Sequence, residues 1–210
     1  MSLTFYYAPM STASITHLVL AELGVPCEMV KIDIKNGEQK KPDYLKLNPN
    51  GKVPTIVHDG TSIWESTAIT MYLGETFGVE KKLYPAPGPK RGEAMRWITW
   101  ANVSLGEAVY RWAHNTQWQP AEMRNAKVAE GAMGDIQTHL GILNDGLAGK
   151  QYLLGNDYSL ADAHLCSYTD WLRHMKVDFA KFDNINAWSK RCAARPAYAK
   201  VMADEMPKQN

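Results

Sequence analysis

Cysteine is scarce in this sequence of 210 residues, and the three cysteines lie far apart. Cys27, Cys166 and Cys192 form no C-x-x-C pair, the spacing that is typical of zinc sites and dithiol redox sites. An odd number of scattered cysteines also gives no disulfide framework. We therefore expect neither a bound metal nor a fold held by disulfides.

The sequence also lacks a long apolar segment and an excess of charge of one sign. No window approaches the roughly 18 uninterrupted apolar residues of a membrane span, and MSLTFYYAPM does not resemble a secretion signal. The 23 basic and 22 acidic side chains nearly balance, so no long-range field favours nucleic acid or an anionic membrane. We expect a cytoplasmic globular protein that binds small molecules.

The first 34 residues alternate between extended and helical patterns. Residues 3–7, LTFYY, are aromatic and β-prone, and apolar residues at helical spacing follow from Ile15 to Leu23. Gly24-Val25-Pro26 ends that helix, and the next segment, CEMVKIDI, alternates like a second strand. This order predicts a βαβ unit, whose two strands are parallel.

A hairpin and a further helix complete the first 78 residues. A short helix is predicted around residues 44–47, and apolar runs at 55–57 and 62–64 flank the Asp-Gly turn of a hairpin. Ser66 is predicted to cap the next helix, whose apolar residues lie on one face. The predicted order for residues 1–78 is β-α-β-α-β-β-α, an α+β domain.

Residues 79–90 contain three prolines among charged residues, which is typical of an exposed connector. Beyond residue 91 the strand alternation disappears and helical periodicity replaces it. We predict an all-α domain over residues 91–210, with helices at 91–117, 121–148, 160–174, 184–194 and 197–205.

Four segments occur in a specific order along the chain: FYYAPMSTAS, PDYLKLNPNGKVPTI, WESTAITMYL and YSLADAHL. With the predicted domain order, they resemble the glutathione S-transferase superfamily over nearly the whole chain, and the first domain resembles thioredoxin. The resemblance implies a cytoplasmic, homodimeric detoxification enzyme. Such an enzyme binds glutathione in the N-terminal domain and activates its thiol for attack on a small apolar electrophile.

The loop after the first predicted strand, PMSTAS, has no cysteine. This argues against a glutaredoxin-like role and against the cysteine-type beta and omega classes, and it resembles the serine-type delta-like, theta-like or nu-like classes. A hydroxyl at the positive end of a helix stabilises a thiolate by hydrogen bond and dipole. Ser11 is the first choice for that hydroxyl, with Thr12 and Tyr7 as alternatives. A plain capping role for Ser11 or Thr12 stays open.

The resemblance also implies which residues hold the tripeptide. Val53-Pro54 matches a cis proline that turns the preceding main chain toward the ligand, although in general only about 5% of X-Pro bonds are cis. At the predicted helix start, Ser66 suits the γ-glutamyl carboxylate and Glu65 its ammonium group. Lys52 and Gln39 are expected to reach the glycine carboxylate at the other end.

The second domain is expected to supply the electrophile pocket, because aromatic walls with a few polar groups suit a flat apolar substrate. The expected residues follow each other near the end of the long first helix of that domain: Tyr110, Trp112, His114 and Trp118. The alternative for Trp112 is a place in the core of the helical bundle.

Ser159 and Asp162 in YSLAD form a capping-box variant that we assign to folding and not to chemistry. Three other functions stay open beside the transferase. They are a glutathione-dependent disulfide reductase or peroxidase, a non-catalytic binding or assembly module of the same fold, and a zeta-type isomerase, although no SSCSxR-like loop is present.

Overall fold

The structure of the protein is a computed structural model that describes residues 2–205. Its N-terminal part is built on a four-stranded mixed sheet of order β2-β1-β3-β4. β1 pairs parallel with β2 and antiparallel with β3, which forms the predicted hairpin with β4. The strands are β1 (Leu3–Tyr7), β2 (Glu28–Lys31), β3 (Thr55–His58) and β4 (Thr61–Trp64).

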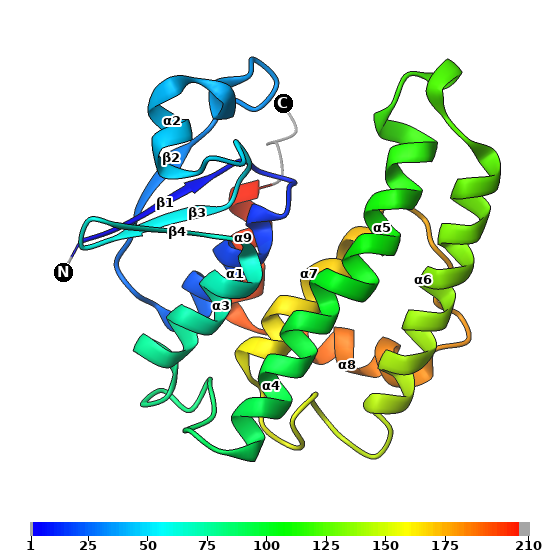
Figure 1. Cartoon of the computed structure of the whole chain (residues 1–210). Helices are drawn as coiled ribbons and strands as arrows, with labels where there is room; N and C mark the ends of the chain where they lie inside the picture. Colours follow the sequence, from blue (N-terminus) through cyan, green and yellow to red (C-terminus); the bar gives the residue numbers. More distant parts are fainter. Residues whose placement is uncertain (1, 206–210) are drawn as a thin grey trace.

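The helices of the N-terminal part cover both faces of the sheet, as Figure 1 shows. They are α1 (Ala13–Leu23), the short α2 (Pro42–Leu47) and α3 (Ser66–Leu73), which continues as a π-helical turn over Gly74–Gly78. Successive strand residues point to opposite faces. In β1, Leu3 and Phe5 belong to the core shared with α1 and α3, whereas the Tyr6 ring lies 6.0 Å from the Tyr44 ring of α2.

Residues from Pro89 to Glu205 form a helical second part, confirming the predicted fold class. A continuous helical run begins with α4 (Pro89–Trp100), passes through a π-helical segment (Ala101–Leu105) into α5 (Gly106–Ala113), and ends in a second π-helical segment (His114–Trp118). The remaining helices are α6 (Ala126–Gly146), α7 (Leu160–His174), α8 (Asp183–Ala193) and α9 (Pro196–Glu205). The expectation that a helix begins at residue 121 is wrong, because Asn125 caps α6 by accepting from the backbone N–H groups of Lys127 and Val128.

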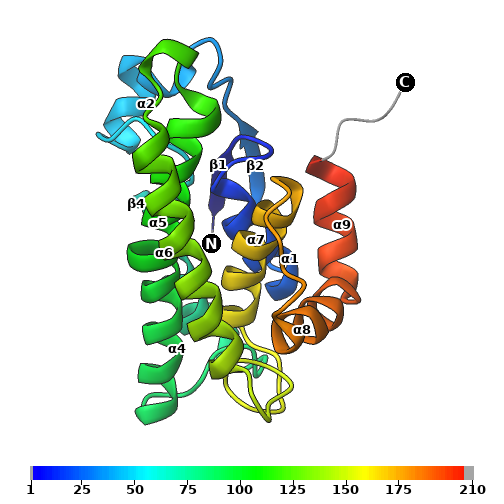
Figure 2. The ribbon, with the colours of Figure 1, turned by 90° about the vertical axis from the view of Figure 1, so that its right-hand side faces the viewer.

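The two parts share one core, which α1 and α3 connect to the helical bundle. α1 packs on α7 and also on α9, and α3 packs on α4. Figure 2 shows α7 and α1 side by side, with α9 next to them. Where the connector passes the start of α7, Leu160 N–H donates to Leu83 O at 2.8 Å. The limits 1–78, 79–90 and 91–210 stay a prediction for where the parts divide.

Asp162 is the buried carboxylate at the start of α7, and it joins three segments of the second part. Its Oδ2 accepts from Ser159 N–H and Oγ, which makes the predicted capping box. Its Oδ1 accepts from Leu153 N–H and from the Trp188 indole of α8, each at 2.8 Å. Because the side chain is 0% exposed, its removal leaves these donors buried without acceptors.

We predict that Asp162→Ala lowers the free energy of unfolding by about 3 kcal/mol, the loss of a helix cap plus unpaired buried donors. Urea unfolding followed by circular dichroism measures the effect. Asp157→Ala is the matched control, because Asp157 is exposed in the same loop. Equal stability of the two variants would contradict a folding role for Asp162.

Candidate functional site

Ser11 makes two hydrogen bonds within the loop between β1 and α1. Met10 has a φ of 55°, in the left-handed region that residues with a Cβ rarely adopt. Ser11 Oγ donates to Ala8 O at 2.7 Å and accepts from Ala13 N–H at 3.1 Å. The Ser11 hydroxyl is thus fixed at the start of α1, where the positive end of the helix dipole favours an anion.

Thr12 links this loop to the segment before β3. Its Oγ1 donates to Val53 O at 3.1 Å, and the Val53-Pro54 bond is cis. The loop and the main chain beside the cis proline are therefore neighbours. Tyr7 ends β1, but its ring faces inward, 5.3 Å from the Phe5 ring and 5.8 Å from the His17 ring.

Buried polar side chains fix the main chain around Val53. Asn48, only 2% exposed, donates from Nδ2 to Lys52 O at 2.8 Å and to Thr55 Oγ1 at 3.1 Å. Tyr44 OH donates to Lys52 O as well. The Lys52 carbonyl, which precedes Val53, therefore accepts two hydrogen bonds, and these fix the main chain of the turn. The Lys52 side chain is exposed.

The segment that carries Gln39 and Lys40 meets the segment before Lys52 at the tight turn of Gly51. A Cβ at Gly51 would lie 2.9 Å from Gln39 O and 2.8 Å from Lys40 Nζ, and the φ of 57° also favours glycine there. Gln39 Nε2 donates to Ile34 O, whereas its Oε1 is buried without a hydrogen-bond partner among the described residues. Two expected ligand groups and a second lysine therefore lie at this corner.

Glu65 and Ser66 lie where β4 passes into α3. Glu65 has a φ of 71° and occupies the N-cap position, and strained backbone of this kind is typical of ligand-binding sites. The expectation that Ser66 caps α3 is wrong: Ser66 is the first helical residue and makes no capping hydrogen bond. Its Oγ instead accepts from Asn102 Nδ2 at 2.9 Å.

Asn102 belongs to a polar network between the sheet domain and the helical bundle. Its Oδ1 accepts from His164 Nε2 at 2.7 Å and from Tyr168 OH at 3.1 Å. His164 Nδ1 in turn pairs with Thr70 Oγ1 of α3 at 2.9 Å. An amide oxygen cannot donate, so the His164 proton is on Nε2, and Thr70 donates to Nδ1. Complete burial lowers the pKa of His164 to about 3 and keeps the ring neutral.

The orientation of the Ser66 hydroxyl follows from this network. Asn102 donates to Ser66 Oγ, and the proton of that hydroxyl is left free for an acceptor outside the network. The start of α3 thus offers both a hydroxyl donor and unpaired backbone N–H groups, which together suit a carboxylate.

An exposed aromatic cluster lies at the end of the long helical run. The Tyr110 ring lies 5.3 Å from the His114 ring and 5.6 Å from the Trp118 ring, and Trp118 lies 5.8 Å from Trp171 of α7. Tyr110 and Trp118 are more than half exposed. Trp112 is not brought to this cluster, because it packs against the buried core.

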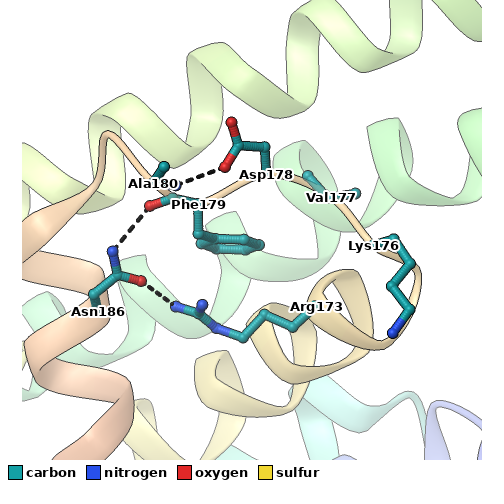
Figure 3. Close-up of a pocket in the computed structure, with 7 residues that line it drawn as sticks. All are labelled: Arg173, Lys176, Val177, Asp178, Phe179, Ala180 and Asn186. Carbon is teal, nitrogen blue, oxygen red and sulfur yellow. Dashed lines mark hydrogen bonds between the residues drawn. The ribbon is translucent and has the colours of Figure 1, made fainter.

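A separate hollow of about 470 Å³ lies at the junction of α7 and α8, as Figure 3 shows. It is wide and open to solvent, and its lining side chains already partner each other. The Arg173 guanidinium lies 4.1 Å from the centre of the Phe179 ring and donates to Asn186 Oδ1 at 2.8 Å. None of its lining residues is one of the expected site residues, so we assign the hollow to the α7–α8 connection.

No group of three or more His, Cys, Asp or Glu side chains within residues 2–205 is arranged to hold a metal ion. No helix within the same residues is long and apolar enough to cross a membrane.

Sequence reasoning missed Asn102 and Trp171, which the structure brings to the expected site residues. Asn102 lies 36 positions from Ser66, and no local pattern marks it. A weak signal existed for Trp171: it follows Tyr168 by three and His164 by seven residues, and such spacing places side chains near one face of a helix.

The fold and the site define a protein with two parts. One is a thioredoxin-like domain with a cis proline beside a hydroxyl-bearing loop, and the other is a helical domain with an aromatic cluster. Residues 1–75 match the glutathione S-transferase N-terminal domain, and residues 107–196 match the glutathione S-transferase C-terminal domain. The chain belongs to the glutathione S-transferase family.

Relatives of similar length support this assignment. The chain is 29% identical to glutathione S-transferase D7 of Drosophila melanogaster over 90% of this chain and 83% of the relative. It is 27% identical to glutathione S-transferase GstB of Escherichia coli K12 over 88% and 89%. The glutathione transferase URE2P6 of Phanerochaete chrysosporium, solved in complex with oxidised glutathione, superposes with a TM-score of 0.90 at 25% identity, covering 97% of this chain and 96% of that one.

The lowered pKa of His164 makes the free energy of unfolding depend on pH. Its pKa is lowered in the folded state from 6.5 to about 3, so the unfolded chain binds this proton first as the pH falls. The stabilising contribution is complete above about pH 6.5 and is lost as the pH falls toward 3. Between pH 7 and pH 5 the loss amounts to about 2 kcal/mol.

Urea unfolding at several pH values compares wild type with His164→Gln, which cannot titrate. We expect the variant to be less stable at pH 7, because it disturbs a buried network, but to lose less stability between pH 7 and pH 5. Parallel pH dependence of the two proteins would contradict a buried neutral His164.

Proposed function

We propose that this protein is a glutathione transferase of the serine type, in which Ser11 stabilises the thiolate of bound glutathione. The observation that supports this best is the hydrogen bond from Thr12 Oγ1 to Val53 O at 3.1 Å. It brings the hydroxyl-bearing loop against the main chain that would pair with the cysteinyl part of the tripeptide in the manner of an added strand.

Ser11 suits the thiolate because of the bonds that it already makes. Ala13 N–H donates to its oxygen, and its proton points to a backbone carbonyl, that of Ala8. A thiolate is a stronger acceptor for that proton than a neutral carbonyl. An ordinary thiol titrates near ~8.5, and a charge-assisted hydrogen bond at the positive end of α1 lowers that value.

The two ends of glutathione would be held by charge and by helix geometry. Ser66 and the first N–H groups of α3 suit the γ-glutamyl carboxylate, and Glu65 suits the ammonium beside it. The exposed Lys52 ammonium suits the glycine carboxylate by its charge, and Gln39 would contribute through its Nε2 donor, which here donates to Ile34 O. Glutathione would thus lie across the end of the sheet, with its thiol at the start of α1.

The aromatic cluster is our proposed electrophile site. Tyr110, His114 and Trp118, with Trp171, offer a cluster of aromatic rings inclined to one another, which suits a small apolar substrate. Trp112 is not part of the proposed electrophile site, because it packs against the buried core. A homodimer and a cytoplasmic location stay predictions, for which sedimentation and cell fractionation are the measurements.

We predict that Ser11→Ala raises the pKa of the bound glutathione thiol by about 1 to 2 pH units, the equivalent of one charge-assisted hydrogen bond. At neutral pH, kcat for conjugation of a chlorinated nitrobenzene would then fall about tenfold or more. The ultraviolet absorbance of the thiolate against pH, at saturating glutathione, measures the pKa directly.

Thr12→Ala is the matched control, because Thr12 is the next hydroxyl in the same loop. We expect it to change the thiol pKa by less than Ser11→Ala, since its proton points to Val53 O. If Thr12→Ala raises the pKa and Ser11→Ala does not, Thr12 is the stabilising hydroxyl and our choice of Ser11 is wrong.

We further predict that Asn102→Asp weakens glutathione binding about tenfold or more while the protein stays folded. Aspartate still accepts from His164 and Tyr168, but it cannot donate to Ser66, and it places a negative charge beside the expected carboxylate. Isothermal titration measures the affinity. Val103→Ala, at a neighbouring residue that is 68% exposed, is the control and should bind glutathione as wild type does.

Disulfide reduction is a second candidate function, because the fungal relative was solved with oxidised glutathione. In this reaction the bound thiolate would attack the glutathionyl sulfur of a mixed disulfide instead of an electrophilic carbon, forming oxidised glutathione as the old S–S bond breaks and the other thiolate leaves. Turnover of a glutathione mixed disulfide without conjugation of a chlorinated nitrobenzene would favour the reductase, and the opposite result the transferase.

A further inference from the structure

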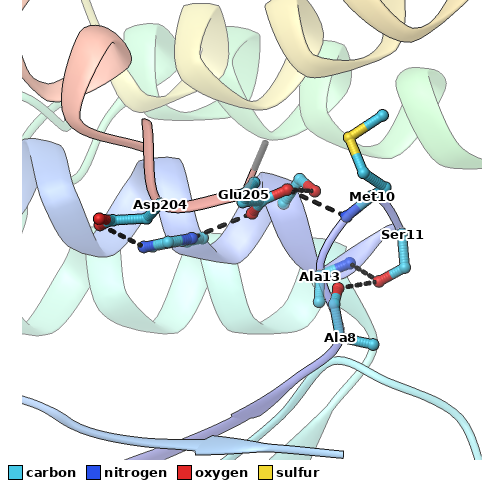
Figure 4. Close-up of polar contacts among 8 residues, drawn as sticks. Ala8, Met10, Ser11, Ala13, Asp204 and Glu205 are labelled. Atoms are coloured by element: carbon cyan, nitrogen blue, oxygen red, sulfur yellow. Dashed lines mark hydrogen bonds and ion pairs between the residues drawn. The ribbon is translucent and has the colours of Figure 1, made fainter. Parts of the chain in front are cut away.

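Glu205, the last residue of α9, reaches the loop that carries Ser11 and Thr12, as Figure 4 shows. Its Oε2 accepts from Met10 N–H at 3.2 Å and from Ser14 Oγ, and its Oε1 lies 3.0 Å from His17 Nδ1. The carboxylate thus contacts the loop, the first turn of α1 and the second turn.

This contact is buried, which sets it apart from surface ion pairs. The Glu205 side chain is 3% exposed and that of His17 is 5% exposed. A buried carboxylate loses its hydration and needs several donors to replace it. Met10, Ser14 and His17 supply these donors, so the position of Glu205 and the position of the loop depend on each other.

Met10 is the residue through which Glu205 acts on the loop. Its φ of 55° is unfavourable for a side chain with a Cβ, and within residues 2–205 the Glu205 side chain is the only one that accepts from its backbone N–H. A strained residue persists only where its surroundings hold it. Ser11 follows directly, so the conformation of Met10 sets the direction of the Ser11 and Thr12 hydroxyls.

We propose that Glu205 is a positioning residue for thiol activation: the last helix of the second domain fixes the loop that presents the thiolate-stabilising hydroxyl. The inference rests on the proposed function. Glu205 lies 195 positions from Met10 in the sequence. Through this contact α9 would support thiol activation without touching glutathione.

The test compares Glu205→Ala and Glu205→Gln with the matched control Asp204→Asn. Asp204 lies next to Glu205, is 51% exposed, and approaches His17 Nε2 only to 3.9 Å. We expect both Glu205 variants to raise the pKa of the bound glutathione thiol by about 0.5 pH unit or more. Their kcat at neutral pH should fall about threefold or more, with the Kd for glutathione within about twofold of wild type. Asp204→Asn should match wild type.

A purely structural role would lower the melting temperature and leave the thiol pKa of the folded protein unchanged, and that outcome overturns the proposal. Met10→Gly separates the two roles further, because glycine adopts a positive φ without penalty. When it is added to Glu205→Ala, Met10→Gly should bring the pKa of the bound glutathione thiol part of the way back down toward the wild-type value. A raised pKa with no recovery would overturn the route through Met10.

A measurement without glutathione distinguishes failure of this proposal from failure of the proposed function. Glu205→Ala should accelerate hydrogen exchange of the Met10 amide at least about tenfold relative to the Ile56 amide of the sheet. Unchanged exchange overturns the positioning role whatever the chemistry is. If glutathione bound to wild type shows an ordinary thiol pKa, and Glu205→Ala still accelerates exchange of the Met10 amide, the positioning role of Glu205 stands and the proposed function is contradicted.

Discussion

Burial of α1 on both sides is the constraint on which the rest of the structure depends. This helix packs on the sheet through the shared core, on α7 of the bundle, and on α9. Eight of its eleven residues are buried, including Thr16 and His17, so it is not an ordinary surface helix with one apolar stripe. Its N-terminus faces the loop with Ser11 and Thr12, and any shift of the helix moves the candidate site.

The same constraint explains why polar groups occur in the domain interface. The Asn102–His164–Thr70 network and the Glu205–His17–Ser14 contact each join the first domain to the second. Apolar packing allows some sliding, whereas buried donors and acceptors must meet at defined distances. Each network ends at a residue of the candidate site: Ser66 in one case and Met10 in the other. The second domain therefore contributes residues to both the proposed electrophile site and the proposed glutathione site.

Much of the fold was predictable because its determinants are local. The parallel β1–β2 pair follows from the βαβ order, the β3–β4 hairpin from Asp59-Gly60, and the start of α7 from Ser159 and Asp162. Errors were also local in origin. Ser66 has the residue type of a cap, but the positive φ of Glu65 makes Glu65 the N-cap and places Ser66 inside α3. At the start of α6, Asn125 took the capping role that the helical pattern alone did not reveal.

The sequence by itself determined the two-part fold and the family, because both rest on short motifs and on the periodicity of apolar residues. It also indicated the segments that we propose to hold glutathione. Only the tertiary structure decided which distant residues hold those segments in place. Asn102 lies 36 positions from Ser66, and Glu205 lies 195 positions from Met10. Trp171 contacts Trp118 from the neighbouring helix α7. The physical reason is that a hydrogen bond or an aromatic contact depends on distances of a few ångströms, which helix packing sets and no local pattern encodes.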